Sequence, residues 1–311
     1  MKILFMGSPD FAVVSLRRLI DEGHEIVGVV SVPDKPQGRG KKLTPMPVKA
    51  AALELGLPVY TPATLKDGAF LEVLEELAPE MITVVDYGKI LPKYVLDYPE
   101  RGCVNVHGSL LPEYRGAAPM QRAIIDGKKK TGVTIQMMDV GLDTGDMILK
   151  REYVIRDDDN FETVHDALAE LGAEALAETV RMAAAGKPTG EAQDDTLSTY
   201  AEKITKEEGH LDFSRDALSL HNRIRGMSPF PLSYSYLADG SILKIVRARV
   251  SDKKAGSAEP GEVISLDGGA ITVACGEGAV DILAVLPQGK GRMPARDYIN
   301  GRKINIGDIL A

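Results

Sequence analysis

The first 32 residues predict a strand, a helix and a second strand, and this order constrains the fold more than any other feature of the chain. Residues 2–6 and 25–32 are short apolar runs, and the apolar residues between them recur at helical spacing: Ala12, Val13, Leu16, Leu19 and Ile20. A β–α–β unit implies a parallel sheet with a right-handed crossover. We expect Ser8 to cap the helix, with Pro9 at its first position.

Alternating strands and helices continue to about residue 185, where the pattern changes. Residues 186–197 are polar and rich in turn formers. One further helix is expected over residues 214–227, capped by Ser214, and short strands separated by glycine-containing turns follow it. We expect an α/β domain with a Rossmann-like, mostly parallel sheet over residues 1–188, a linker over 189–207, and a small β-barrel or sandwich over 208–311.

Several classes of protein are excluded by simple features. The first turn has one glycine, Gly7, and lacks the G-x-G-x-x-G pattern, so no nicotinamide or flavin cofactor is expected. The two cysteines, Cys103 and Cys275, lie in separate apolar runs, and no Cys/His spacing fits a metal site. No apolar run approaches the ~18 residues of a membrane span. We expect a cytoplasmic protein with no metal and no membrane partner.

The net charge of −8 belongs mainly to the middle of the chain. Residues 152–208 contain 5 basic and 15 acidic side chains, whereas residues 1–151 contain 19 of each and residues 209–311 contain 13 basic and 11 acidic. A local field decides whether a protein binds nucleic acid, so the low overall pI does not exclude that partner.

Residues 33–47 form a long loop with four prolines and two glycines, and no regular element is expected there. The loop is basic, with four cations near its centre: Lys35, Arg39, Lys41 and Lys42. It is either a solvated surface loop or an arm that binds phosphate groups.

The stretch VNVHGSLLPEYRGAAP, residues 104–119, carries the strongest chemical signal. Asn105 and His107 are two residues apart, so in a strand both side chains leave the same face. His107 is also the one histidine of five that ends a predicted buried strand, where open α/β sheets bind ligands. Asp143 follows in a glycine-flanked loop, GLDTGD, and a carboxylate can orient an active histidine.

These three residues suit acyl transfer without a covalent enzyme intermediate. The competing interpretations are a histidine satisfied within the core, a turn aspartate, and a Ser-His-Asp hydrolase. The hydrolase is disfavoured because no G-x-S-x-G elbow exists and Ser109 follows His107 too closely.

The motifs resemble those of the folate-dependent formyltransferases. VNVHGSLLPEYRGAAP and GVTIQMMDVGLDTGD carry the resemblance to the wider family. FMGSPDFA, QGRGKKLTPMPVK, YGKILP, YAEKITKEEGHLDFSR and the C-terminal GAVDILAVLPQGKGRMPARDYINGR extend it to the branch that acts on aminoacyl-tRNA, along nearly the whole chain.

The resemblance implies a formyltransferase fold followed by an OB-type barrel that binds tRNA. The implied reaction moves a formyl group from the co-substrate 10-formyltetrahydrofolate to the α-amino group of methionine on initiator methionyl-tRNA. Asn105, His107 and Asp143 match the family's catalytic residues. A monomer is expected.

The resemblance also implies the binding residues. Those matching the folate pocket are Ser109, Leu110, Leu111, Pro112, Tyr87, Gly88, Ile90, Leu91, Val140, Gly141 and Leu142. Those matching the tRNA-binding loop are Lys35, Arg39, Lys41 and Lys42. Asp86 departs from the family pattern, which places a small residue before Tyr-Gly in the pterin wall.

Two other functions fit parts of these motifs. A formyltransferase acting on a sugar or nucleotide amine would share Asn105, His107 and Asp143 but would need neither the basic loop nor the barrel. An RNA-binding protein with a silent α/β domain would need the loop and the barrel but not the intact Asn-His-Asp set.

Overall fold

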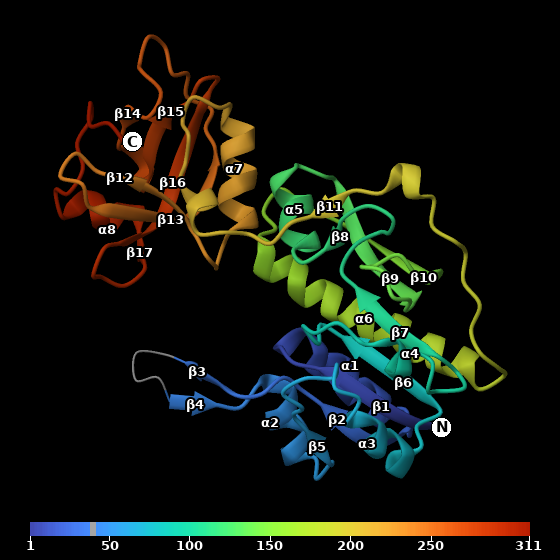
Figure 1. The fold of residues 1–311 in the computed structure, drawn as a ribbon. Coiled ribbons are helices and arrows are strands. Elements are labelled where there is room, and N and C mark those ends of the chain that lie inside the picture. Colours follow the sequence, from blue (N-terminus) through green and yellow to red (C-terminus); the bar gives the residue numbers. More distant parts are fainter. Residues whose placement is uncertain (38–41) are drawn as a thin grey trace. The chain divides into compact units, whose positions relative to one another are not determined.

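The computed structural model describes residues 1–37 and 42–311 and divides the chain into two compact units (Figure 1). The first unit comprises Met1–Gly116, Thr131–Tyr153 and His165–Ala201. The second comprises Ala117–Lys130, Val154–Val164 and Glu202–Ala311. In the part of the chain described, no helix combines the length and apolarity needed to cross a membrane.

The first unit is built on a seven-stranded sheet with the order β10-β9-β7-β6-β1-β2-β5. Its strands are β1 (Lys2–Gly7), β2 (Glu25–Val30), β5 (Val59–Tyr60), β6 (Met81–Val85), β7 (Cys103–His107), β9 (Lys130–Met137) and β10 (Met147–Val154). β1 pairs in parallel with β2 and β6, and β6 pairs in parallel with β7. β2 also pairs in parallel with β5, whereas β9 runs antiparallel to β7. The prediction of a mostly parallel sheet is confirmed.

Helices cover both faces of this sheet. The helices of the unit are α1 (Asp10–Asp21), α2 (Pro47–Glu54), α3 (Phe70–Leu77), α4 (Lys93–Leu96) and α6 (Phe161–Ala183), whose first turn falls in the second unit. Side chains of α3 and α4 pack in one core with Leu4, Ile82 and Val84 of the strands. On the opposite face, a Cβ on Gly172 of α6 would lie 2.8 Å from the Cγ1 of Val106.

Two local expectations for the first unit are wrong. Ser8 does not cap α1, which begins at Asp10 without a side-chain cap. Its buried hydroxyl instead donates to the Tyr87 carbonyl and accepts from the Val32 amide, at 3.1 and 3.3 Å. Backbone groups at the ends of neighbouring strands need partners once buried, and this need outweighs the cap.

The basic loop also contains regular structure that we did not expect. β3 (Lys35–Gln37) and β4 (Lys42–Thr44) pair as an antiparallel hairpin in which Pro36 lies opposite Leu43. Proline is tolerated because both strands are edges, where an N–H is not required on the outer side. Residues 38–41 lie outside the described residues.

The second unit is centred on an antiparallel half-barrel sheet with the order β12-β13-β16-β15-β14, and β17 pairs with β16. Its elements are β12 (Ser233–Tyr236), β13 (Ile242–Val250), β14 (Val263–Ser265), β15 (Ile271–Ala274), β16 (Ala279–Pro287), β17 (Met293–Pro294), α5 (Pro119–Ile125), α7 (Ala217–Gly226) and α8 (Ala295–Asn300). The short strands expected from the sequence are confirmed.

The predicted cap of α7, Ser214, is wrong by two residues. Asp216 caps the helix by accepting from the Ser219 amide at 2.9 Å, while the hydroxyl of Ser214 donates to Asp212. A carboxylate next to the first turn is both a better acceptor and a better match to the helix dipole than a hydroxyl two residues earlier.

Candidate active site

Asn105 and His107 lie on β7, the fifth strand from the β5 edge of the sheet. Val106 faces α6, so its two neighbours face the α3 and α4 side. In the antiparallel pairing with β9, Gln136 lies opposite Asn105 and Thr134 lies opposite His107. The sequence prediction that the amide and the imidazole share one face is consistent with this register.

The imidazole of His107 has an acceptor at each nitrogen. Nε2 lies 2.8 Å from the Tyr114 carbonyl oxygen, and Nδ1 lies 3.5 Å from Oδ1 of Asp143. The ring is only 6% exposed. A doubly protonated ring can donate in both directions, whereas a neutral ring donates in one. The carbonyl on one side and the carboxylate on the other therefore hold the ring in one orientation.

Asp143 is held by donors other than the histidine. Gln136 Nε2 donates to Oδ1 at 2.8 Å and the Gly116 amide donates to Oδ2 at 2.9 Å. The residue has a φ of 54°, in the left-handed region that non-glycine residues rarely adopt. Such a conformation persists only where the surroundings impose it.

The rest of the GLDTGD loop is built from close approaches. Asp139 Oδ1 accepts from the Gly141 amide and from the Thr144 hydroxyl, at 3.0 and 2.7 Å. A Cβ on Gly145 would lie 1.7 Å from the Met137 carbonyl oxygen. Only glycine fits at position 145, and this explains why the loop can fold back towards β7.

The turn expected to bind folate, residues 109–112, is tied to the sheet. Ser109 is fully buried and its hydroxyl donates to the Glu113 carbonyl at 2.6 Å, while Leu111 is 1% exposed. Thr134 Oγ1 donates to the Ser109 carbonyl and accepts from the Leu111 amide. Side-chain surface remains at Leu110 and Pro112, which are half-buried.

The segment 86–91 after β6 combines buried anchors with exposed residues. Tyr87 and Leu91 belong to the core, and Lys89 Nζ donates to the carbonyls of Pro62 and Ala63 at 2.7 and 2.8 Å. Gly88 is exposed, and Ile90 is 75% exposed. The anchors fix the segment while its apolar tip faces solvent.

Asp86, the departure from the family pattern, is an exposed residue with a φ of 45°. Its carboxyl group has no hydrogen-bond partner among the residues described. Dense protein around the group desolvates it and raises its pKa, an effect that His165 reduces and Asp10 increases.

Apolar side chains are exposed on the second expected folate segment as well. Val140 is 75% and Leu142 is 60% exposed, and Gly141 between them is also exposed. Like Ile90, they are large apolar side chains exposed on a loop of the first unit.

Two of the four expected tRNA-binding residues fall on the β3–β4 hairpin. Lys35 begins β3 and Lys42 begins β4. Arg39 and Lys41 lie outside the described residues.

Three residues near the site were missed by sequence reasoning: Tyr114, Gln136 and Gln193. Gln193 Nε2 donates to the carbonyls of Asp143 and Gly145, both at 2.8 Å. The alternation of β9 places Gln136 on an inward face, but the pairing that sets it beside Asn105 has no local signal. Gln193 lies in a segment whose composition indicates a linker.

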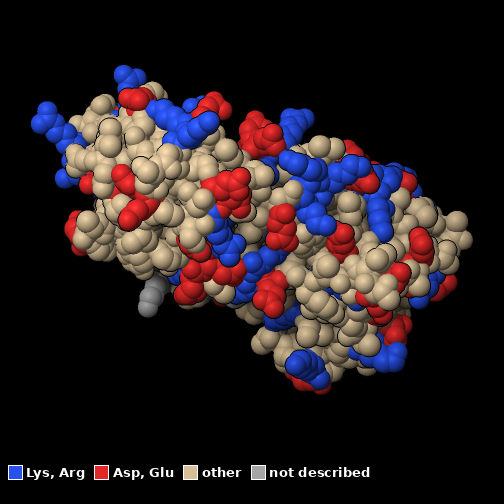
Figure 2. Space-filling view, turned by 90° about the horizontal axis from the view of Figure 1, so that it is seen from above, with Lys and Arg blue, Asp and Glu red and all other residues tan. Residues whose placement is uncertain are grey.

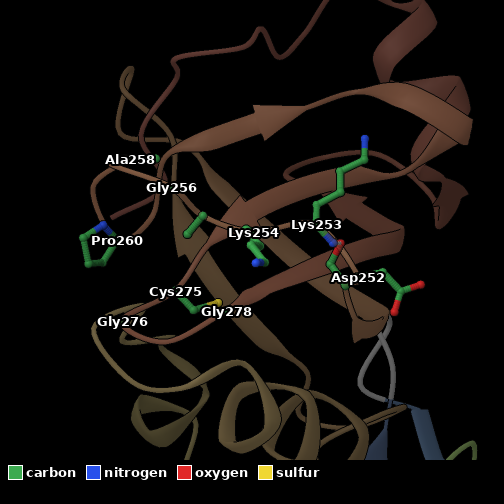
Figure 3. Close-up of a pocket in the computed structure, with 11 residues that line it drawn as sticks. Asp252, Lys253, Lys254, Gly256, Ala258, Pro260, Cys275, Gly276 and Gly278 are labelled. Carbon is green, nitrogen blue, oxygen red and sulfur yellow. Dashed lines mark hydrogen bonds between the residues drawn. The ribbon is translucent and has the colours of Figure 1, made fainter.

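A cavity of 470 Å³ lies in the second unit, apart from these residues (Figure 3). Its wall includes Lys253 and Lys254 from the loop after β13 and Cys275 from the end of β15. Lys253 bonds to Ser265 and Asp267, and burial raises the pKa of the Cys275 thiol to about 12. The thiol in the wall of this cavity is therefore not ionised near neutral pH. Among the residues described, no group of three or more His, Cys, Asp or Glu side chains could hold a metal ion.

The fold and the site define a formyltransferase. The Formyl transferase family model matches residues 1–180, and the model of the Formyl transferase C-terminal domain matches residues 203–303. The chain belongs to the formyl transferase family.

Full-length relatives carry a more specific name. The chain is 49% identical to the methionyl-tRNA formyltransferase of Caldanaerobacter subterraneus subsp. tengcongensis, over 100% of both proteins. It is 48% identical to the methionyl-tRNA formyltransferase of Geotalea daltonii, over 100% of this chain and 98% of the relative.

Solved structures share the fold at lower identity. A methionyl-tRNA formyltransferase from Clostridium thermocellum has a TM-score of 0.54 at 18% identity, over 82% of this chain and 95% of that one. An N-formyltransferase from Helicobacter canadensis, in complex with folinic acid and dTDP-3-aminofucose, has a TM-score of 0.67 at 17% identity, over 91% and 98%. HypX from Aquifex aeolicus in complex with tetrahydrofolic acid has a TM-score of 0.65 at 17% identity, over 98% and 48%.

Proposed function

We propose that this chain transfers the formyl group of 10-formyltetrahydrofolate to the α-amino group of methionine on methionyl-tRNA. The observation that carries the proposal is the placement of His107 against Asp143, with Asn105 on the same face of β7. The full-length relatives, named for this reaction on this acceptor, support the choice of substrate.

The chemistry follows from the groups present. A free α-amino group has a pKa of ~7.7–8.0, so part of it is neutral near pH 7 and can attack the formyl carbon. The attack forms a C–N bond and places negative charge on the formyl oxygen. We assign stabilisation of this oxyanion to the Asn105 amide and the protonated His107 ring.

The proton balance is assigned to Asp143 and His107. The attacking amine must lose a proton, and the folate nitrogen gains one as its bond to the formyl carbon breaks. Nε2 of His107 is committed to the Tyr114 carbonyl, so Nδ1, which faces Asp143, is the nitrogen able to serve the reacting groups. We assign to Asp143 the proton that the amine releases, and to Nδ1 of His107 the proton that the folate nitrogen gains as its bond to the formyl carbon breaks. Asp143 then returns its proton to the ring, so both groups end in their starting state.

The folate that donates the formyl group would bind to the two loops that expose apolar side chains. Ile90 on one loop and Val140 and Leu142 on the other offer apolar surface, and exposed backbone at Gly88 and Gly141 offers polar groups to a pterin. Pockets for such ligands combine apolar walls with a few polar groups that fix orientation. We assign the folate to these loops and to the turn at residues 109–112.

The tRNA that accepts the formyl group carries phosphates, which the basic β3–β4 hairpin would attract. Residues 35–42 contain four basic residues and no acid, which favours phosphate binding by counterion release. On the face seen in Figure 2, basic and acidic side chains are interspersed. We assign the main phosphate contacts to the hairpin, Lys35, Arg39, Lys41 and Lys42, with the C-terminal domain as a second contact. We further propose initiator methionyl-tRNA as the acceptor, and a monomer that works in the cytoplasm.

A sugar amine is the alternative acceptor, because the Helicobacter canadensis structure is of a complex with an amino sugar nucleotide. One assay separates the candidates: 10-formyltetrahydrofolate is supplied with charged initiator tRNA, charged elongator tRNA, or dTDP-3-aminofucose. We expect formylation of the initiator alone. Formylation of the sugar with none of the tRNA would overturn the proposal.

A further inference from the structure

The segment between α6 and the second unit makes an unusual set of contacts with the active site. We refer to residues 191–201 as the brace; they include a 3-10 turn (Asp195–Leu197) and β11 (Tyr200–Ala201). The brace begins where Glu191 pairs with Met147. It ends at β11, which pairs in parallel with β8 (Arg115–Gly116) and lies beside it in Figure 1. All of these contacts lie within the first unit.

Gln193 uses its whole hydrogen-bonding capacity on the site. An amide NH₂ has two hydrogens and an amide oxygen has two lone pairs. Nε2 donates to the carbonyls of Asp143 and Gly145, and Oε1 accepts from Nε and a terminal nitrogen of Arg115, at 3.0 and 2.8 Å. Since the four bonds define which end is nitrogen, the side chain has one orientation, and it fixes the backbone on both sides of Thr144.

Arg115 connects this amide to the rest of the brace. The side chain is 3% exposed, and it also donates to Asp195 at 2.7 Å. A buried guanidinium requires charged or polar partners, and Gln193 and Asp195 supply them.

The other end of the brace holds Tyr114. Thr199 Oγ1 accepts from the Tyr114 amide at 2.8 Å, and the Thr199 carbonyl accepts from the Arg115 amide at 2.8 Å. The Tyr114 carbonyl is the acceptor of His107 Nε2. The brace thus bonds to the two residues, Tyr114 and Asp143, that face the two nitrogens of the catalytic ring.

Both of those residues are in the left-handed region, with φ of 59° for Tyr114 and 54° for Asp143. A connector that served only to join two domains would be expected to leave its polar groups to water. Here the polar groups of Gln193 and Thr199 bond to Asp143 and Tyr114, two residues in unfavourable backbone conformations.

We propose that the brace positions His107, with Gln193 and Thr199 as positioning residues for formyl transfer. The proposal rests on the proposed function, because it assigns His107 to the reaction. It predicts that a change at Gln193 acts on turnover through the orientation of the ring, without contact with either substrate.

The test uses the full chain with Gln193→Glu and Thr199→Val, and with Thr199→Ser and Ala192→Ser as matched controls. Glutamate keeps the shape of Gln193 but turns its donor into an acceptor against two carbonyls. Valine removes the Thr199 oxygen and serine keeps it. Ala192 is exposed and adjacent to Gln193.

We expect kcat to fall roughly 10- to 100-fold for Gln193→Glu, since small misplacements of reacting groups cost this much. Thr199→Val should cost less, because Thr199 is exposed and water can replace its hydroxyl. The KM of each substrate should stay within about twofold, as expected when ground-state binding is kept. Thr199→Ser and Ala192→Ser should match the unsubstituted protein.

A second readout does not depend on activity. Imidazole ¹⁵N resonances of His107, assigned by their loss in His107→Gln, should shift in Gln193→Glu and Thr199→Val but not in the controls. Unmoved resonances, or unchanged kcat, would overturn the positioning role. A protein that formylates no tRNA would instead defeat the proposed function, and the resonances would still test the brace. Should Gln193→Glu fail to fold, the Thr199 pair decides.

Discussion

Asp86 and Asp143 share an unusual backbone conformation but differ in the contacts of their carboxyl groups. Both are non-glycine residues with positive φ, at 45° and 54°, on loops that leave the same sheet. Asp143 has two donors on its carboxylate and a histidine beside it. Asp86 has no hydrogen-bond partner among the residues described, and desolvation raises its pKa. Positive φ is therefore common to both residues, and the contacts that fix the carboxylate distinguish Asp143, which we propose as catalytic.

Replacing the carboxylate of Asp143, and separately that of Asp86, by an amide is the strongest test of the difference between the two residues. Asparagine tolerates positive φ, so both substitutions preserve the backbone. We expect Asp143→Asn to lower kcat about 10³-fold, within the range for loss of acid–base assistance. Asp86→Asn is the matched control and should keep kcat within about twofold. Steady-state formylation of methionyl-tRNA measures both, and equal losses would refute the distinction.

Asn105→Ala tests the residue that shares a face of β7 with His107. Removing an oxyanion donor typically lowers turnover by ~10²–10³. We expect a loss of that order in kcat with the KM for the folate little changed, because the amide acts on charge that develops during the reaction. Turnover close to that of the unsubstituted protein would remove Asn105 from the mechanism.

Arg39→Ala tests whether the hairpin serves the acceptor and not the two loops. We expect the KM for tRNA to rise about 10-fold and its dependence on log salt to weaken by about one unit of slope, as for a lost phosphate contact. The KM for the folate should not change. Lys66→Ala, an exposed lysine outside the hairpin, is the control. Equal effects on both substrates would place the hairpin over the folate instead.

Ile90→Ala tests whether the loop that carries Asp86 contributes to folate binding. Covering an exposed isoleucine with a ring is worth ~0.8 kcal/mol per methylene, so the KM for the folate should rise several-fold. Leu53→Ala on α2, at a leucine that is 57% exposed, should have no effect. An unchanged KM for Ile90→Ala would assign the donor to other residues.

The smallest effect concerns stability at Asp86. A raised pKa means that the folded state binds the proton more tightly than the unfolded state, so the carboxylate costs stability above its folded pKa. Asp86→Asn should therefore be more stable than the unsubstituted protein at pH 7, and the gain should vanish below the ordinary value of ~3.9. Exposure limits the gain to below about 1 kcal/mol. Denaturant unfolding at pH 7 and pH 3.5 measures it, and a pH-independent difference would contradict the assigned cause.

The fold was predictable from the sequence where local patterns dominate. Short apolar runs identified β1 and β2 to within two residues, and the change of pattern after residue 227 identified the short strands of the second sheet. The errors at Ser8 and Ser214 share one cause, since a serine before a helix was assumed to be its cap while other polar groups competed for it. The β3–β4 hairpin was missed because four prolines outweighed a weak pairing signal.

The site was predictable only in part for a similar reason. Asn105 and His107 share a strand, and Asp143 sits in a recognisable turn. Gln136 and Gln193 reach Asp143 across sequence separations of 7 and 50 residues. Pairings of this kind depend on the completed sheet, and a polar segment such as residues 186–197 has no periodicity that would place it against an active site.

The brace also determines what can be removed from this protein. The two family matches stop at residue 180 and resume at residue 203, so a fragment trimmed to the first match would keep Asn105, His107 and Asp143 yet lose Gln193, Asp195 and Thr199. Such a fragment would leave the Arg115 guanidinium without Gln193 and Asp195. For this architecture, exchange of C-terminal domains between family members preserves the catalytic half intact only when the junction falls after Ala201.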